Sequence, residues 1–523
     1  MLRLNNLFVP LNATEADILK LAAQKLNLKT TDLPDFKITK KSVDARNKKN
    51  VHFVYSIDCN APLPPHPDKD IELILPTETL SFKIKDDGIR PVVVGSGPAG
   101  MFAALALAEA GLKPIILERG SCVEDRRQKI LSFWQGNALD PENNVQFGEG
   151  GAGTFSDGKL MTGIKKDKFV AKVINEFYLA GAPQEILYLA KPHIGTDKLR
   201  IVVKNLRQKI INLGGEYRFG NKLTGLVIKN GKLTAIKVRN AENEYELPAN
   251  KLFLAIGHSA RDTFEMLHQA GLYMQQKPFS VGARIEHPQN LINRAQYGNA
   301  AESPYLSAAD YKLAVHLKNG RSAYTFCMCP GGQVVAAASE PGRVVTNGMS
   351  EFARNKINAN AALLVGVDRQ DFASDEPLAG MYFQRRLEEA AFRFGGQNYC
   401  APAQLVGDFL ANRSSKHGGS VEPSYQPAVT WTDLNLVLPP EITDTMRAGI
   451  TEMAKKLHNF NMFDAVLTGV ETRSSSPVRM VRDETMQANI KGIYPCGEGA
   501  GYAGGITSSA ADALKVVFSL CTP

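Results

Sequence analysis

The sequence predicts an α/β protein with a Rossmann-like parallel sheet, and three observations support this fold class. Short apolar runs at residues 91–94 and 251–256 each lead into glycine, as buried parallel strands do at a sheet's carboxyl edge. A G-x-G-x-x-G turn at residues 95–100 joins the first run to an Ala/Leu-rich segment. Glycine clusters recur much later, at residues 148–158 and 497–505, where a ligand that approaches the backbone would need them.

The first motif has the order of a dinucleotide-binding unit. After the turn, residues 101–110 predict a helix, and a second apolar run at residues 115–117 ends in Glu118. In such a unit the glycines allow a tight turn, approach to a pyrophosphate and close helix packing. Helix N–H groups favour the anion, and the acidic side chain accepts hydrogen bonds from a ribose. An ordinary βαβ unit is the alternative. The residues expected at the cofactor are Gly95, Ser96, Gly97, Pro98, Ala99, Gly100, Glu118 and Arg119.

Length and composition predict a soluble, multidomain protein. With 523 residues, 44% apolar and 22% charged, the chain should form two or three domains. The net charge of +8 permits an anionic substrate but does not imply nucleic acid. Seven scattered cysteines predict free thiols, and the N-terminus lacks a signal-peptide pattern. We therefore expect a cytoplasmic protein with no membrane segment and no metal site.

Four segments are expected in chain order. Residues 1–88 predict a small α+β domain of ferredoxin-like character that ends in a proline-rich linker. Residues 89–275 form the first part of the cofactor domain, residues 276–460 an inserted α+β substrate domain, and residues 461–523 the return to the cofactor domain. Within the insertion, strands are expected at residues 311–317, 323–328 and 333–338, and helices at 351–355, 381–394 and 440–460.

The first domain carries a basic hairpin between strands expected at residues 36–42 and 51–59. Its cluster consists of Lys40, Lys41, Arg46, Lys48 and Lys49. A solvated hairpin tip is the simpler interpretation, and RNA or an acidic partner is the alternative.

The cofactor domain contains a second glycine-rich stretch that predicts a wall for a planar ring. Five glycines in the eleven residues 148–158 cannot pack a side-chain core, so this loop is expected to lie flat against a ligand or at the surface. Helices are expected at residues 123–133, 169–179 and 198–213, and strands at 215–219, 223–229, 233–238 and 251–256. Further residues expected at the cofactor are Gly150, Gly151, Ala152, Gly153, Thr154, Ser156, Asp157, Ala255, Ile256 and Gly257.

Together these motifs resemble the uncharacterised FAD-dependent dehydrogenases of bacteria, an NAD(FAD)-utilising dehydrogenase-like family within the glutathione-reductase-type flavoproteins. The resemblance rests on VVVGSGPAGMFAALALAEAG with ILERG, GEGGAGTFSDGKLMTG, KPHIGTDKLR, FLAIGHSARDTFEML, ETRSSSPVRM and YPCGEGAGYAGGITSSAADAL. It implies a glutathione-reductase-type FAD-binding fold with FAD as cofactor. It also implies cofactor contacts from Leu223 at the adenine and from Gly497, Glu498, Gly504, Gly505 and Ile506 near the ribityl chain and flavin.

The sequence shows no second strand–G-x-G-x-x-G–helix unit, and no C-x-x-x-x-C pair such as disulfide reductases carry beside the flavin. NAD(P)H therefore stays an alternative as a transient electron donor. A C-x-C at Cys327 and Cys329 is a candidate for redox or metal chemistry, although cysteines packed beside the flavin or in the core are the simpler interpretation.

The expected activity is two-electron (hydride) transfer between a small-molecule substrate in an inter-domain cleft and the flavin N5. Such transfer needs an anion clamp, for which Arg473 and Arg479 are candidates, and a base, for which His193 and His258 are candidates. The alternatives are a tRNA-modifying flavoprotein that uses the basic hairpin and a non-catalytic FAD-binding redox sensor.

Overall fold

The computed structural model describes residues 1–33, 35–74, 80–163 and 167–521. At its centre lies a five-stranded sheet in the order β22-β11-β5-β6-β7, with every neighbouring pair parallel. The strands are β5 (Val92–Val94), β6 (Ile115–Glu118), β7 (Glu216–Phe219), β11 (Leu252–Leu254) and β22 (Ile493–Pro495). The expected α/β fold with a parallel sheet is therefore confirmed.

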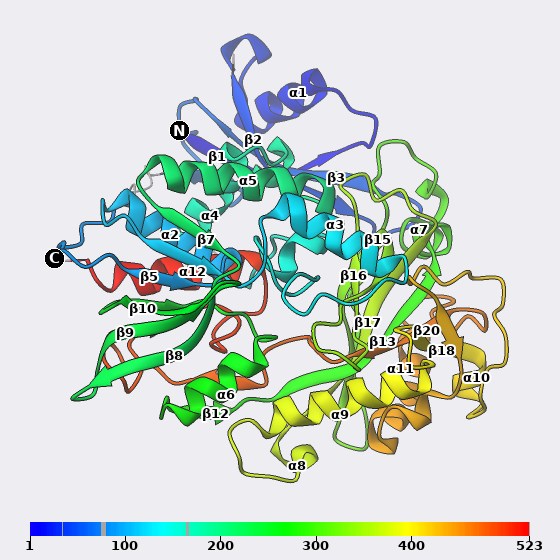
Figure 1. Cartoon of the computed structure of the whole chain (residues 1–523). Coiled ribbons are helices and arrows are strands. Elements are labelled where there is room, and N and C mark those ends of the chain that lie inside the picture. The colour runs from blue at the N-terminus through cyan, green and yellow to red at the C-terminus, as the bar shows by residue number, and fades with distance from the viewer. Residues whose placement is uncertain (34, 75–79, 164–166, 522–523) are drawn as a thin grey trace.

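Helices cover one face of this sheet. They are α2 (Pro98–Glu109), α3 (Val123–Trp134), α4 (Lys168–Leu179), α5 (Thr196–Asn212) and α12 (Ile506–Phe518). Helix α2 is buried from Ala99 to Ala108, and its alanines let α12 pack alongside it. In Figure 1 these two helices, blue and red, lie together although some 400 positions separate them in the chain. The first and last motifs thus belong to one layer.

An antiparallel three-stranded sheet covers the other face. Its strands are β8 (Lys222–Lys229), β9 (Lys232–Arg239) and β10 (Glu244–Pro248), in the order β10-β9-β8. Leu223, Ile236 and Val238 share a core with Leu117 and Leu254 of the parallel sheet. Helix α6 (Arg261–Gln269) and the pair β12 (Met274–Gln276) and β21 (Val478–Met480) complete this part.

A second, larger sheet lies to the right in Figure 1. It runs in the order β14-β15-β17-β13-β20-β18-β19, with β16 paired to β15. The strands are β13 (Phe279–Pro288), β14 (Ala314–His316), β15 (Ser322–Ala336), β16 (Thr346–Met349), β17 (Asn358–Val367), β18 (Ala401–Leu405), β19 (Val429–Trp431) and β20 (Val466–Glu471). Its helices are α7 (Gln289–Tyr297), α8 (Arg369–Phe372), α9 (Ala379–Phe394), α10 (Val406–Leu410) and α11 (Pro440–Ala454).

The second sheet differs from expectation at several points. Two expected strands merge into the single bulged strand β15, and the expected helix at residues 351–355 consists of turns. Strands β13 and β17 were missed because both are buried throughout and show no polar alternation. The chain was expected to return to the cofactor domain at residue 461. This is wrong for β20, because β20 pairs with β13 and β18 and so still belongs to the second sheet.

The N-terminal segment forms a four-stranded antiparallel sheet in the order β2-β3-β1-β4. Its elements are β1 (Leu2–Val9), α1 (Glu15–Leu26), β2 (Phe36–Asp44), β3 (His52–Cys59) and β4 (Ile71–Leu73). The ferredoxin-like motif has a second helix before its last strand. Residues 60–70, all described, contain no helix and include the proline-rich stretch, so this segment lacks the second helix of the ferredoxin-like motif.

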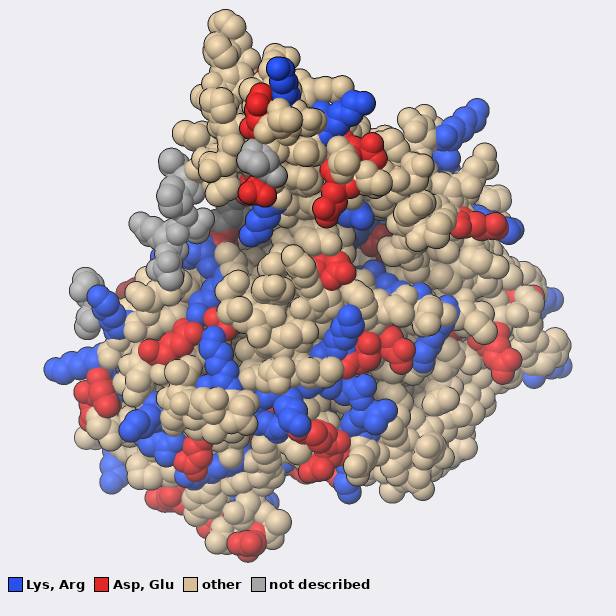
Figure 2. Space-filling view, turned by 90° about the horizontal axis from the view of Figure 1, so that it is seen from above, with Lys and Arg blue, Asp and Glu red and all other residues tan. Residues whose placement is uncertain are grey.

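The basic hairpin is only partly free. Lys41 lies 4.2 Å from the Phe53 ring centre, and its backbone bonds to Tyr188 and Ala190 of the cofactor-binding part. Arg46 pairs with Asp44 at 2.5 Å. On the face shown in Figure 2, Lys and Arg are interspersed with Asp and Glu instead of forming one patch. In the described part of the chain, no helix combines the length and apolar character needed to cross a bilayer.

Candidate active site

A cavity of about 800 Å³ lies between the carboxyl ends of the parallel strands and the second sheet. Its walls include all three glycine clusters, represented by Gly97, Gly151 and Gly505. Residues of β15, β16 and β20 line the opposite side. The expected residues that line it are Gly95, Ser96, Gly97, Pro98, Ala99, Glu118, Arg119, Gly151, Ala152, Gly153, Ser156, Asp157, Leu223, Ala255, Ile256, Gly257, His258, Arg473, Glu498, Gly504, Gly505 and Ile506.

Two helix N-termini open onto this cavity. Gly97 is the N-cap of α2 and Gly505 the N-cap of α12, and neither helix start has a side-chain capping hydrogen bond. Unpaired N–H groups and the positive ends of both helix dipoles therefore face the same space. This arrangement suits an elongated ligand with anionic groups near both helices.

Glu118 holds the loops at one end of the cavity together. Its Oε2 accepts hydrogen bonds from the Ser96 N–H and hydroxyl at 2.9 Å, and its Oε1 accepts from the Gly120 and Gly148 N–H groups at 2.9 and 3.0 Å. One buried carboxylate thus fixes the first glycine turn against the second glycine loop.

A charged cluster lies beside this end. Arg119 donates to Glu142 and to Asp262, and its guanidinium stacks 4.0 Å from the Phe147 ring centre. Lys222 pairs with the same two carboxylates. Against burial, Arg119 and then Lys222 keep the pKa of Asp262 below its ordinary range. Arg119, Lys222 and Leu223 all line the cavity, so this end offers both cations and an apolar surface.

Four residues expected at the cofactor lie beneath the cavity wall instead. A Cβ on Gly100 would lie 1.8 Å from the Gly95 carbonyl, which confirms the expected close packing of helix on strand. A Cβ on Gly497 would lie 2.6 Å from the Cβ of Ala99. Gly150 and Thr154 contact each other, and Thr154 is 1% exposed. These residues shape the loops without being among those that line the cavity.

His258 and Glu498 meet across the cavity wall, with Nε2 3.7 Å from Oε1. Burial, with Arg473, Arg261 and Lys277 nearby, lowers the pKa of His258 to about 3, so this imidazole is neutral at neutral pH. Burial raises the pKa of Glu498 to about 7, although Lys277 opposes the shift. The pair therefore brings a neutral imidazole next to a carboxyl that exchanges its proton near neutral pH.

The remaining candidates for catalysis lie in other surroundings. Arg473 reaches the wall, but its guanidinium donates to Glu388 at 3.0 Å and to Ser339 at 2.6 Å, so it is a member of a buried ion network and not a free anion clamp. His193 stacks on Phe352, and burial lowers its pKa to about 4. Arg479 lies over the Tyr502 ring. Neither His193 nor Arg479 is among the residues that line the cavity.

The second sheet and the segment just before β14 supply cavity residues that were not among the predicted site residues. They are Asp310, Tyr311, Lys312, Thr325, Phe326, Cys327, Met328, Asn347 and Glu471, joined by Lys159 from the second glycine loop. The C-x-C was a signal for Cys327. Glu471 and Lys159 lie in the motifs ETRSSSPVRM and GEGGAGTFSDGKLMTG, whereas the remaining residues carry no local pattern, because the tertiary arrangement of the second sheet brings them to the cavity.

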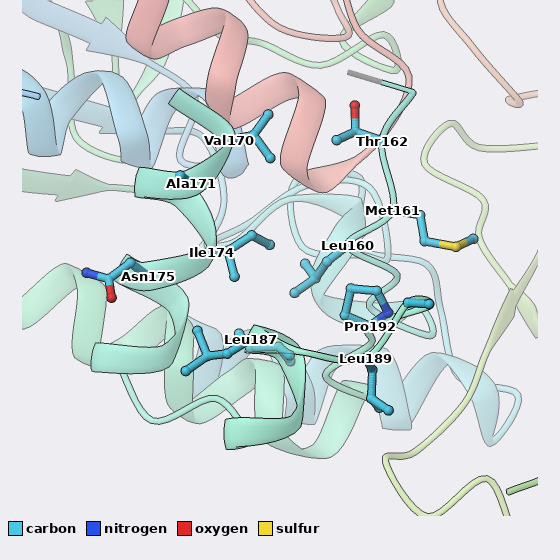
Figure 3. A pocket seen from close by; sticks show the side chains of 12 residues that line it. Leu160, Met161, Thr162, Val170, Ala171, Ile174, Asn175, Leu187, Leu189 and Pro192 are labelled. Atoms are coloured by element: carbon cyan, nitrogen blue, oxygen red, sulfur yellow. The ribbon is translucent and has the colours of Figure 1, made fainter. Parts of the chain in front are cut away.

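A second hollow of about 540 Å³ lies beside the first. In Figure 3, Leu160, Ile174 and Leu187 extend into it from three separate segments. Met161 and Thr162 border both spaces. The described residues that line it include no acid or base, so this part of the hollow offers mainly apolar contact.

Three family models match the chain. Residues 90–273 match a pyridine nucleotide-disulphide oxidoreductase model, and residues 278–474 match the C-terminal domain-like model of FAD-dependent proteins. Residues 1–60 match a domain of unknown function. An uncharacterised protein of Clostridium beijerinckii is 48% identical over 524 residues, which cover 98% of this chain and 97% of that protein.

Solved structures give a weaker likeness. A triple mutant of the flavin-dependent brominase Bmp2 matches with a TM-score of 0.37 at 11% identity, over 82% of this chain and 77% of that one. A flavoprotein/dehydrogenase from Cytophaga hutchinsonii matches with a TM-score of 0.36 at 12% identity, over 82% and 76%. Likenesses of this strength say nothing about a substrate.

The fold, the cavity and the family models define an FAD-dependent oxidoreductase, with FAD as the cofactor. This replaces the alternative of a non-catalytic flavin sensor. The chain belongs to the uncharacterised FAD-dependent oxidoreductase family that includes the Clostridium beijerinckii protein.

The cavity fits this cofactor by its own geometry. Two uncapped helix starts are available for the pyrophosphate and the flavin, and glycines keep the backbone open beside both. His258 Nδ1 is buried and has no hydrogen-bond partner among the described residues, as expected for a group that meets a ligand.

Proposed function

We propose that the protein catalyses two-electron transfer between a small-molecule substrate and FAD held in the 800 Å³ cavity. The observation that carries this proposal is the His258–Glu498 pair in the wall of the cavity formed by the three glycine clusters. Bound FAD supplies the chemistry, as donor or acceptor of a hydride at the flavin N5. The substrate side is the wall from the second sheet.

The proposed cofactor contacts divide along the cavity. The N-terminus of α2, with Gly97 and Ala99, binds the pyrophosphate, while Glu118 and Leu223 contact the ribose and adenine. At the other end the N-terminus of α12, with Gly505 and Ile506, would hold the flavin ring. That positive helix end stabilises negative charge on the reduced ring.

Glu498 is the proposed proton-transfer group. Because its pKa lies at about 7, Oε1 is able to hold a proton in one half-reaction and lose it in the other. His258 stays neutral and orients the carboxyl or the substrate through a ring N–H. The second sheet, with Tyr311 and Asn347, excludes water and orients the substrate.

The proposed organisation follows the expected four segments with one change. Residues 1–88 form the appended α+β domain, residues 89–275 begin the FAD domain, and the substrate domain from residue 276 extends beyond residue 460 to include β20. The chain then completes the FAD domain with β22 and α12.

Anaerobic flavin reduction tests the proposal. The purified protein should be yellow, and one class of donor in a panel of metabolites, NADH and NADPH should bleach the flavin. Glu498→Gln should slow reduction at least about tenfold, whereas the exposed control Glu242→Gln should not. Reduction by NADH or NADPH alone would assign a transient pyridine nucleotide donor. A flavin that no donor reduces at a useful rate would contradict the proposal.

A further inference from the structure

Cys327 occupies an irregular point of β15, where this strand faces the cavity. The pairing with β17 shifts between Phe326 and Cys329, so one extra residue is accommodated there as a bulge. Cys327 itself has φ 42°, a left-handed conformation that a non-glycine residue adopts only at a cost. Bulges next to ligand sites re-aim side chains, and Cys327 is among the residues that line the cavity.

Two cations lie close to this thiol. Lys159 donates a hydrogen bond to the neighbouring Met328 carbonyl, and Arg284 donates to the Cys327 carbonyl at 2.9 Å. Arg284 is 0% exposed and is also paired with Glu471, while Lys159 lies 3.0 Å from Asp157. Each cation is therefore held in place by a carboxylate.

The charged surroundings favour the thiolate of Cys327. The Cys329 S–H, Lys159 and Arg284 lower the pKa of Cys327 well below its ordinary range, against burial and the charge of Asp157. Glu471 and Glu498 are the other acids near the thiol. Its hydrogen bond with Cys327, and then burial, raise the pKa of Cys329, which keeps its proton and donates to the Cys327 carbonyl oxygen at 3.3 Å.

Other cysteines provide an internal comparison. Cys496 lines the same cavity, but burial raises its pKa. Cys122 lies at the partly exposed start of α3, and burial raises its pKa as well. The bulge and the two cations thus distinguish Cys327 from a second cysteine of the same cavity.

We propose that Cys327 is a nucleophilic thiolate that undergoes exchange with a small disulfide in the FAD cavity. The thiolate sulfur attacks one sulfur of the disulfide, a new S–S bond forms, the old one breaks, and the leaving sulfur departs with the electron pair as a thiolate. A disulfide suits this cavity better than a carbon electrophile. Two electrons and one proton, which an FAD-dependent oxidoreductase supplies, reduce the mixed disulfide and regenerate the Cys327 thiolate. An alkylated cysteine is not regenerated by such a reduction.

This inference deepens the proposed function, and its test does not depend on turnover. The FAD-loaded protein is treated with iodoacetamide at about pH 6, and each modified cysteine is quantified by peptide mass mapping. Cys327 should react at least about tenfold faster than Cys122. Lys159→Met should slow the reaction of Cys327, Lys159→Arg should largely restore it, and Cys122→Ser should leave it unchanged.

A second measurement uses glutathione disulfide as the probe. The intact mass should increase by one glutathione, the adduct should map to Cys327, and dithiothreitol should remove it; Cys327→Ser should form no adduct. Equal reactivity of Cys327 and Cys122, or an adduct on another cysteine, would overturn the inference. Flavin reduction in the same samples separates the two proposals. If Cys327 is unreactive but the flavin is reduced, only the thiolate role is refuted. If Cys327 is reactive but no donor reduces the flavin, only electron transfer from the donors of the panel is refuted.

Discussion

Glu118 Oε2 accepts two hydrogen bonds from Ser96, one from the backbone N–H and one from the hydroxyl, both 2.9 Å long. The acid at the end of β6 therefore acts on the glycine turn as well as facing the cavity. Its other oxygen fixes Gly120 and Gly148. Glu118, which is expected to contact a ribose, therefore also holds the two glycine loops together.

Replacing this carboxylate should affect both stability and cofactor binding. Glu118→Ala leaves four donors without their acceptor, so we expect a loss of about 3 kcal/mol in the free energy of unfolding and weaker FAD binding. Urea denaturation and flavin titration measure the two effects. The exposed Glu242→Gln should change neither, and a stable Glu118→Ala protein with full FAD affinity would contradict this role.

Gly151 and Gly231 separate backbone strain from cofactor binding. Both have positive φ, 62° and 72°, so alanine should cost about 1–2 kcal/mol at either site. A Cβ on Gly151 would also lie 3.0 Å from the Gly97 Cα, whereas nothing lies within 4 Å of one on Gly231. We expect only Gly151→Ala to weaken FAD binding. Equal FAD affinities of the two variants would remove Gly151 from the cofactor site.

The ion network around Arg473 should be structural. Arg473→Met leaves Glu388, which is 0% exposed, with one guanidinium fewer, and such losses cost about 3–5 kcal/mol. Arg479→Met removes only an exposed contact with the Tyr502 ring and should cost less than about 1 kcal/mol. Chemical denaturation compares the two variants. Similar unfolding midpoints would argue against the network.

Glu498 should make the FAD-free protein less stable as the pH rises. Its pKa is about 7 in the folded state and near 4.5 when unfolded, so between these values the unfolded chain binds fewer protons. The stability of the wild type relative to Glu498→Gln should therefore fall across this range, by on the order of 3 kcal/mol. Denaturation at several pH values provides the measurement, and a constant difference would exclude the shift.

Buried His287 should act in the opposite direction. Burial lowers its pKa to about 4, and its Nε2 lies 2.9 Å from the Phe460 carbonyl oxygen. Below about pH 6.5 the unfolded state binds the additional proton, so stability is lost as the pH falls, by about 1.4 kcal/mol per pH unit. His287→Gln should reduce this slope by one proton, and the exposed control His316→Gln should not. An unchanged slope in His287→Gln would show that this histidine is charged when folded.

The glycine turns, the strands next to them and the acid at residue 118 were predictable because each is a local requirement. The turn at Gly95 needs a residue that tolerates positive φ, and the close packing of helix on strand needs a residue without a Cβ at Gly100. Both requirements fall within a span of about ten positions. Most helices between residues 98 and 269 and the β8–β9 hairpin followed from apolar periodicity in the same way, whereas strand β10 was not expected. These patterns were sufficient to indicate a dinucleotide-binding α/β protein, and the family resemblance implied that the dinucleotide is FAD.

The wall opposite the glycine loops depended on the tertiary structure. Antiparallel pairing of β13 with β20 and of β15 with β16 brings Glu471 and Asn347 to the cavity, and a bulge in the pairing of β15 with β17 turns Cys327 toward it. Strands buried on both faces have no polar alternation, so the sequence indicated neither their register nor their partners. Whether Arg473 was free or paired depended on a glutamate 85 residues away. The sequence by itself indicated a dinucleotide-binding protein through local backbone demands, the family resemblance implied FAD, and only the fold decided which distant side chains share that cavity.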